Sequence, residues 1–225
     1  MRVLMKPFLS NFNNEESGVR RVIEFYHKYA PKHGIEYVEC EVEDEDAYDV
    51  FCVHAGATIK YAKYKPLQSC LHGLYWSADY NARAWEWRTN ANVIEAMRRS
   101  TSITVPSEWV AESIRRDMRI DPFIVPHGIE WEDWVHDGTY EEYALWNKNR
   151  IGDVCSPEPV GALADRFSGM QFISTFMPSI PQANIKEIGG VGHERMKGLI
   201  QHACVYLATT KETFGIGALE ALASG

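Results

Sequence analysis

An apolar run near the end of the chain leads through a loop with two glycines into a stretch rich in alanine and leucine. The run, residues 203–208, has the length of a strand. The stretch that begins at Gly215 and Gly217 has the composition of a helix. This order leaves unpaired N–H groups at the positive end of the helix dipole, and glycines let an anion approach them closely. The segment therefore predicts an α/β unit with a site for a phosphate group.

Two glutamates flank these glycines, with seven residues between them. Glu212 precedes the predicted helix, whereas Glu220 lies more than one turn inside it. Carboxylates accept hydrogen bonds from hydroxyls, so one of them could bind a sugar and the other a ribose. The alternative is that both are solvated surface charges, the common state of acidic residues.

The rest of the chain alternates between strand and helix patterns. We expect strands at residues 2–9, 36–42, 49–53, 102–105, 123–125, 143–146, 171–175 and 185–188. We expect helices at residues 18–33, 90–99, 108–117, 162–167 and 194–203, with Ser107 as an N-cap and residues 123–125 as a short buried strand. This alternation predicts parallel sheets with helices on their faces. A connection at residues 130–142 divides the chain into domains 1–136 and 137–225.

Residues 211–225 as a whole resemble the Glu-x7-Glu signature of the retaining family 4 glycosyltransferases. Residues 13–20, 104–111 and 125–129 are similar to three other landmarks of that family, in the same order along the chain. The resemblance implies a GT-B fold, in which a Rossmann-like acceptor-side domain precedes a Rossmann-like domain that binds the donor in the cleft. Family members continue further, so the second domain is expected to be incomplete, with an open sheet edge that favours self-association.

The implied activity is transfer of a hexose from a nucleoside diphosphate sugar to an unidentified acceptor hydroxyl, with retention of configuration and without metal or cofactor. Glu212 would hold the donor sugar and Glu220 the ribose. The other implied donor-binding residues are Gly18, Lys148, Arg150, Thr213, Phe214, Gly215 and Ile216. Arg150 matches the first cationic position of the family. The family has a lysine as its second cationic position, but residues 151–159 of this chain contain none. Lys148 or the helix start near Pro157 would take the place of that lysine.

His72 matches the cleft histidine that lies close to the donor sugar in this family, and with Glu212 it is the predicted catalytic residue. Its alternative role is a structural hydrogen bond. The pairs Cys52-Val-His54 and Cys70-Leu-His72 have the same spacing, and alternate residues of a strand share one face. A Cys2His2 zinc site is therefore conceivable, but strands explain this spacing and zinc sites more often come from loops. We predict no metal site.

Five aromatic residues cluster between residues 75 and 87. Aromatic faces pack against the C–H surfaces of sugars, so Trp76 and Trp85 are candidates for an acceptor platform. The alternative is core or interdomain packing, because aromatic side chains dominate buried area.

Composition narrows the class of protein. A net charge of -8 argues against a broad nucleic-acid-binding surface, and five scattered cysteines do not form a disulfide framework. No apolar run approaches the roughly 20 residues that span a bilayer, and the N-terminus lacks a secretory pattern. We therefore expect a cytoplasmic enzyme. The alternatives are a GT-B sugar-nucleotide epimerase and a catalytically inactive nucleotide-binding or interaction fragment.

Overall fold

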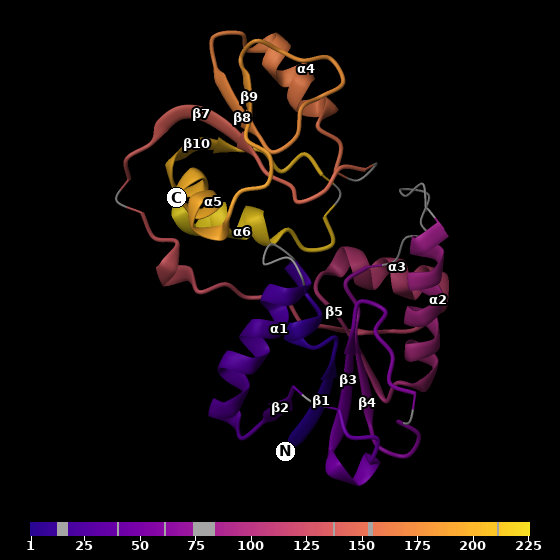
Figure 1. The fold of residues 1–225 in the computed structure, drawn as a ribbon. Helices are drawn as coiled ribbons and strands as arrows, with labels where there is room; N and C mark the ends of the chain where they lie inside the picture. Colours follow the sequence, from indigo (N-terminus) through magenta and orange to yellow (C-terminus); the bar gives the residue numbers. More distant parts are fainter. Residues whose placement is uncertain are drawn as a thin grey trace. The chain divides into compact units, whose positions relative to one another are not determined.

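The structure is a computed structural model that describes residues 1–12, 18–39, 41–60, 62–73, 84–136, 138–152, 155–210 and 212–225. The chain divides into two compact units, unit 1 (Met1–His127) and unit 2 (Gly128–Gly225) (Figure 1). This division lies earlier in the chain than the expected one after residue 136. The assignment of the two parts to acceptor and donor stays a prediction.

Unit 1 contains a parallel sheet with the strand order β2-β1-β3-β4-β5-β6. Its strands are β1 (Arg2–Lys6), β2 (Glu36–Val38), β3 (Val50–His54), β4 (Leu67–Cys70), β5 (Ser102–Val105) and β6 (Phe123–Ile124). Its α-helices are α1 (Gly18–Tyr29), α2 (Ala84–Arg99) and α3 (Glu108–Met118), and short 3-10 helices are η1 (Leu9–Asn11), η2 (Ala30–His33) and η3 (Glu45–Ala47).

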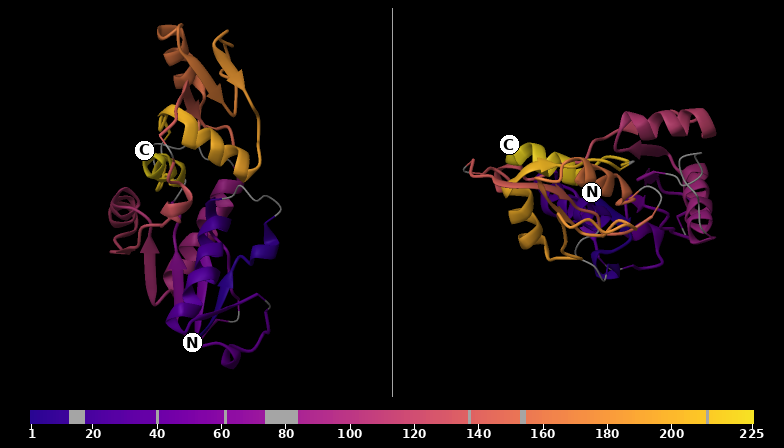
Figure 2. Two further views of the ribbon diagram at one scale, coloured as in Figure 1. Left: turned by 90° about the vertical axis from the view of Figure 1, so that its left-hand side faces the viewer. Right: turned by 90° about the horizontal axis from the view of Figure 1, so that it is seen from above.

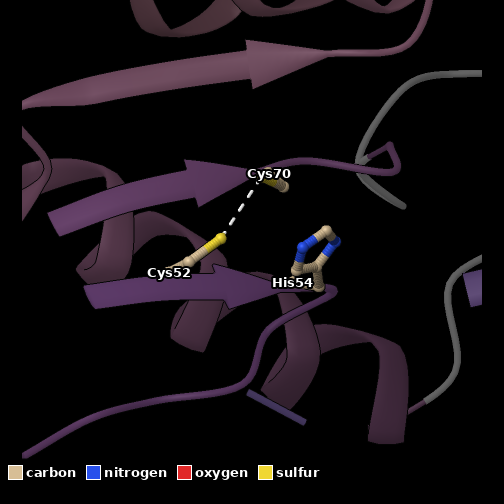
Figure 3. A group of neighbouring side chains, drawn as sticks. All are labelled: Cys52, His54 and Cys70. Atoms are coloured by element: carbon tan, nitrogen blue, oxygen red, sulfur yellow. Dashed lines mark hydrogen bonds between the residues drawn. The ribbon is translucent and has the colours of Figure 1, made fainter. Parts of the chain in front are cut away.

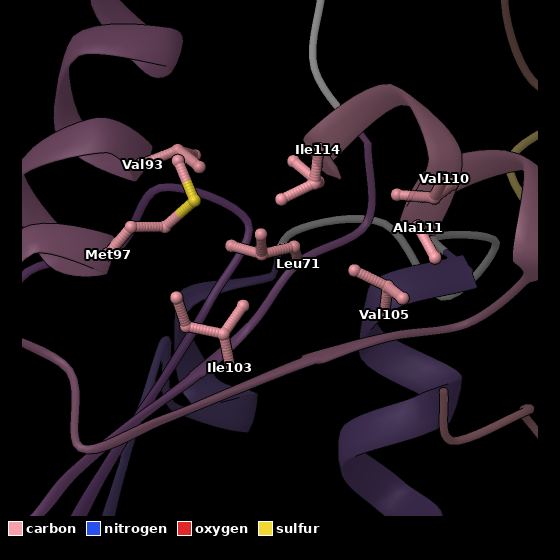
Figure 4. Close-up of a cluster of buried hydrophobic side chains, with 8 residues drawn as sticks. All are labelled: Leu71, Val93, Met97, Ile103, Val105, Val110, Ala111 and Ile114. Carbon is pink, nitrogen blue, oxygen red and sulfur yellow. The ribbon is translucent and has the colours of Figure 1, made fainter. Parts of the chain in front are cut away.

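Helices cover both faces of this sheet (Figures 1 and 2). Because successive strand residues point to opposite faces, Val3 and Met5 pack with Ile23 of α1, whereas Leu4 packs in a different cluster with Ala96 of α2. A third cluster joins α2 and α3 to β5 (Figure 4). Its buried members are Leu71, Val93, Met97, Ile103, Val105, Val110, Ala111 and Ile114. The inner strands β1, β3, β4 and β5 therefore form a largely buried central layer.

The ends of several elements differ from the sequence predictions. The strand predicted at residues 2–9 ends at Lys6, because Pro7 cannot donate to a strand ladder. The helix predicted at residues 18–33 ends at Tyr29, and the 3-10 helix η2, with Pro31 in its first turn, follows from Ala30. The prediction that residues 123–125 are buried is wrong: Phe123 is 68% exposed, because β6 is the edge strand. Ser107 does cap α3, and its Oγ accepts a hydrogen bond from the Val110 N–H at 3.4 Å.

Unit 2 contains a parallel sheet with the strand order β10-β7-β8-β9. Its strands are β7 (Glu141–Trp146), β8 (Gln171–Ser174), β9 (Ile185–Glu187) and β10 (Ala203–Tyr206). Its helices are η4 (Trp131–Asp133), α4 (Glu158–Arg166), α5 (His193–His202) and α6 (Ile216–Ser224). Ala144 and Trp146 of β7 face the side covered by α4, and Tyr143 and Leu145 face the side where Ile200 of α5 packs.

These two sheets confirm the predicted α/β class with Rossmann-like parallel sheets. β10 and β9 form the edges of the second sheet, and self-association through such an edge stays a prediction. Among the described residues, no helix is both long enough and apolar enough to cross a membrane.

Candidate functional site

The second sheet reverses its order of growth between β7 and β10. The chain places β8 and β9 on one side of β7 and then returns to place β10 on the other side. In open parallel sheets, ligands bind outside the carboxyl ends of the strands at such a switch point. Lys148 and Arg150 follow β7 and Glu212 follows β10. Three of the predicted donor-binding residues therefore share one edge of the sheet.

An ion pair joins the loops after β7 and β10. Lys148 Nζ lies 2.5 Å from Glu212 Oε1, which also accepts a hydrogen bond from Thr210 Oγ1 at 3.0 Å. The backbone N–H of Lys148 donates to Thr175 Oγ1 at 2.8 Å, directly after β8. The Lys148 side chain is 11% exposed and that of Glu212 is 37% exposed. Thr175 therefore fixes the backbone of Lys148 and Thr210 fixes the carboxylate of Glu212. Solvent reaches the pair through the Glu212 side chain, which is the more exposed of the two.

The surrounding charges keep Glu212 ionised. Burial alone would raise the pKa of its carboxyl, but Lys148, Thr210 and Arg150 together outweigh burial and hold this pKa below its usual value. Arg150 is exposed and acts on the carboxylate electrostatically. At neutral pH the site therefore offers one carboxylate and two cations side by side, which suits a ligand that carries both hydroxyls and phosphates.

Glycine is required where α6 begins. Gly215 precedes the helix with a φ of 84°, in the left-handed region that favours glycine. A Cβ at Gly217 would lie 2.5 Å from Tyr206 Oη, and this hydroxyl is held by a hydrogen bond to Asn147 Oδ1 at 2.6 Å. The helix start therefore packs closely on the ends of β7 and β10. Thr213, Phe214 and Ile216 lie in this same segment and are partly buried.

Glu220 is buried in α6, with 2% of its surface exposed. The alternative that both glutamates are solvated surface charges is therefore wrong for Glu220. The hydroxyl of Ser224 donates to the Glu220 carbonyl at 3.0 Å, and Ser224 is also buried.

Unit 1 places three histidines at the carboxyl end of its sheet. His54 ends β3, His72 lies just after β4, and His127 follows β6. His54 Nδ1 lies 3.0 Å from His72 Nε2, and the rings of His72 and His127 stack with centroids 5.2 Å apart. Burial, followed by the neighbouring imidazoles, holds the pKa of His72 well below its usual value. Burial and His54 likewise lower the pKa of His127 to about 4. Both rings are neutral at pH 7.

Two buried cysteines lie beside His54, the first of these histidines (Figure 3). Cys52 Sγ lies 3.6 Å from Cys70 Sγ. The hydrogen bond between them raises the pKa of the Cys52 thiol and lowers that of Cys70. The ligand atoms of Cys52, His54 and Cys70 all lie within 4.8 Å of one another. The two Cys-x-His pairs of the sequence therefore do come together in space.

The remaining predicted residues are more scattered. Gly18 is the exposed first residue of α1. Trp85 begins α2 on the surface and is 51% exposed, so it is not a core residue. Trp76 lies outside the described residues.

Three residues of the unit 2 site were missed by sequence reasoning. Asn147 directly follows β7, Thr175 directly follows β8, and Tyr206 ends β10. Their positions at strand ends could have predicted them, because polar side chains at the carboxyl ends of parallel strands gather at one edge of the sheet. His127 was part of a recognised segment but was not predicted as a site residue.

The two sheets define a mixed α/β protein with parallel sheets of Rossmann-like type. One of 44 matching chains of solved structures is TarM, a GT-B glycosyltransferase, with a TM-score of 0.60 over 78% of this chain. The sequence identity is 10%, and the chain spans 39% of the length of TarM. No protein-family model matches the chain, and no curated protein matches it. The likeness confirms the predicted fold.

Proposed function

We propose that unit 2 binds a nucleoside diphosphate sugar and that the protein transfers its hexose to an acceptor hydroxyl with retention of configuration. The observation that carries this proposal is the ion pair between Lys148 and Glu212, located at the switch point of the sheet and beside the glycine start of α6. A carboxylate for sugar hydroxyls and cations for phosphates lie together at the edge where such sheets bind ligands.

The diphosphate would bind to the positive groups of this edge. Lys148 and Arg150 provide two cations, and the N–H groups at the start of α6 add the positive end of a helix dipole. The leaving group gains negative charge as the glycosidic bond breaks, so preorganised cations stabilise the transition state more than the ground state. Lys148 fits the role of the missing second cation, because Glu212 and Thr175 already fix its position.

The carboxylates would bind the hydroxyls of the donor. Glu212 is ionised and partly exposed, so it can accept hydrogen bonds from the hexose. Glu220 is assigned to the ribose by the resemblance. Glu220 is 2% exposed, so it is not a solvated surface charge.

In the proposed reaction, the acceptor oxygen forms a bond to the anomeric carbon on the face from which the phosphate oxygen departs. The bond from that carbon to the phosphate oxygen breaks, and the departing oxygen takes the proton of the acceptor hydroxyl. His72 is assigned to the donor sugar by the resemblance. Since its imidazole is neutral, it can donate one hydrogen bond and accept another.

The stereochemistry of the product tests this proposal. The full chain is incubated with α-linked UDP-, GDP- and ADP-hexoses and a panel of alcohol and sugar acceptors, and anomeric protons are followed by NMR. We expect an α-linked product from one donor and its loss in Glu220→Gln. A β-linked product would contradict retention. Isomerisation of the donor without acceptor would instead identify an epimerase, and donor binding without any turnover a nucleotide-binding module.

A further inference from the structure

The buried cluster of Cys52, His54 and Cys70 has no role in the proposed transfer reaction. All three side chains come from the carboxyl half of the first sheet, in unit 1. His54 and Cys70 are direct partners across β3 and β4, and Cys52 lies two residues before His54 on β3. Since alternate residues of a strand share a face, the register places these side chains on the same face of two neighbouring strands. Figure 3 shows them converging there.

The distances fit a tetrahedral metal ion. With Zn–S bonds of about 2.3 Å, tetrahedral geometry places two thiolate sulfurs about 3.8 Å apart. The sulfurs of Cys52 and Cys70 are 3.6 Å apart, and the three ligand atoms lie within 4.8 Å of one another. Small side-chain rotations would therefore bring all three into contact with one ion.

His54 has a ring nitrogen suited to this purpose. Its Nδ1 lies 3.0 Å from His72 Nε2, whereas its Nε2 is buried and has no hydrogen-bond partner in the described part of the chain. If Nδ1–H donates to His72, the Nε2 lone pair is left to bind a metal. Such an outer hydrogen bond is the usual way in which proteins orient a ligating histidine.

The charge balance also favours a divalent ion. The cluster is buried, and α1 covers it with Tyr26, whose ring packs edge-on against that of His54 at 5.6 Å between centroids. Two thiolates and a neutral imidazole bound to Zn²⁺ give a complex with no net charge, which is the form least penalised by burial. Tyr37 and Thr104 also adjoin the two cysteines, and both are uncharged.

A disulfide fits this geometry less well. Two residues along a strand and one strand spacing place the Cα atoms of Cys52 and Cys70 roughly 8 Å apart. Cysteines with Cα atoms more than about 7 Å apart cannot be bridged without movement of the backbone. In a central sheet that movement would disrupt the ladder between β3 and β4.

We propose that Sγ of Cys52, Sγ of Cys70 and Nε2 of His54 bind one Zn²⁺ ion, with water in the fourth position and His72 as the positioning residue of His54. Binding deprotonates the two thiols and releases their protons to solvent. Sulfur and imidazole ligands in a tetrahedral arrangement select zinc over calcium and magnesium. The proposal differs from the prediction of no metal site, which was based on strand structure as the explanation of the Cys-x-His spacing.

Metal titration of the full chain tests this site independently of any donor or acceptor. The chain is freed of metal with a chelator, titrated with Co²⁺ and monitored by visible and near-ultraviolet absorption, and then competed with Zn²⁺. We expect one equivalent of Co²⁺ with tetrahedral d–d bands and thiolate charge-transfer bands, all abolished by excess Zn²⁺. Cys52→Ser and Cys70→Ser should lose the charge-transfer bands, and exposed Cys204→Ser should retain them.

The His72→Ala variant tests whether His72 positions His54 or is itself a metal ligand. We expect it to keep the tetrahedral spectrum with affinity reduced about tenfold to a hundredfold, as is typical for loss of an outer hydrogen bond. X-ray absorption of the zinc-loaded wild-type chain requires no variant and should show two sulfur neighbours at about 2.3 Å. An octahedral spectrum, no saturable binding, or a zinc shell without sulfur would overturn the proposal.

Discussion

Lys148 Nζ lies 2.5 Å from Glu212 Oε1, although these residues are 64 positions apart and follow different strands. Their proximity is a consequence of topology, because β10 pairs with β7 rather than with β9. The parallel register aligns the carboxyl ends of β7 and β10, so both loops emerge at one edge. The pairing of β10 with β7 therefore brings the residues of the proposed donor site together.

Neutralising either member of this ion pair should weaken donor binding more than it weakens the fold. We expect Lys148→Met and Glu212→Gln to reduce affinity for the sugar nucleotide by about tenfold to a hundredfold, the value of hydrogen bonds to charged groups. The free energy of unfolding should change by about 1 kcal/mol or less, since Glu212 is partly exposed. Urea denaturation and ligand titration check the two effects, with exposed Lys186→Met as the control.

A methyl group at Gly217 should destabilise unit 2. The new Cβ would lie 2.5 Å from Tyr206 Oη, and we expect Gly217→Ala to cost about 1–3 kcal/mol, as is typical of overpacking. Gly198→Ala in α5 is the control, because its Cβ would meet nothing within 4 Å. That change should be neutral or stabilise the protein by up to about 1 kcal/mol.

Removal of the clashing hydroxyl gives a second check of this packing. Tyr206→Phe deletes Oη and its hydrogen bond to Asn147. We expect Gly217→Ala combined with Tyr206→Phe to be more stable than the sum of the two separate effects predicts. Additive effects in thermal and urea unfolding would contradict the proposed contact.

Unit 1 should lose stability as the pH falls from about 6.5 toward 4, because histidine has a pKa of about 6.5 when unfolded. In the folded chain, burial and then His54 lower the pKa of His127 to about 4. The unfolded state therefore binds more protons in this window, so stability rises with pH across it. For the metal-free protein, His127→Gln should reduce the difference in unfolding free energy between pH 7 and pH 5 by on the order of 1 kcal/mol. Exposed His33→Gln is the control, and an equal pH dependence in all three proteins would refute the assignment.

Trp85 should affect the acceptor rather than the fold. Because Trp85 is 51% exposed, we expect Trp85→Ala to change the unfolding free energy by about 0.5 kcal/mol or less. If it belongs to the acceptor platform, the variant should raise the acceptor KM and leave donor hydrolysis unchanged. Trp87→Ala, at a position 58% exposed on the same helix, is the matched control. Unfolding of the Trp85 variant would show a packing role instead.

The sequence was most informative where local pattern and tertiary position agree. The apolar run and glycines around Gly215 predicted β10, the loop and α6, because strand and helix composition there suffices to specify each element. Ser107 could be predicted as a cap from local chemistry alone. The exposure of Phe123 could not, because an edge strand and a central strand differ only in their neighbours.

Pairwise contacts of the candidate sites were less predictable. The Lys148–Glu212 pair depends on the position of β10 beside β7, which no local pattern specifies. The convergence of Cys52, His54 and Cys70 depends on the register between β3 and β4. A slip of one residue in that register would turn Cys70 to the opposite face. Strand periodicity alone predicted the spacing within each pair but not the contact between pairs.

Calorimetric titration with UDP-, GDP- and ADP-sugars measures whether unit 2 binds a sugar nucleotide. Wild-type chain, Lys148→Met and Glu212→Gln are compared after circular dichroism has established that each is folded. We expect saturable binding of one nucleotide class at one site per chain, with clearly weaker binding in both variants. Absence of binding to the folded wild-type chain, or equal affinity in all three proteins, would contradict a donor site at the switch point of the second sheet.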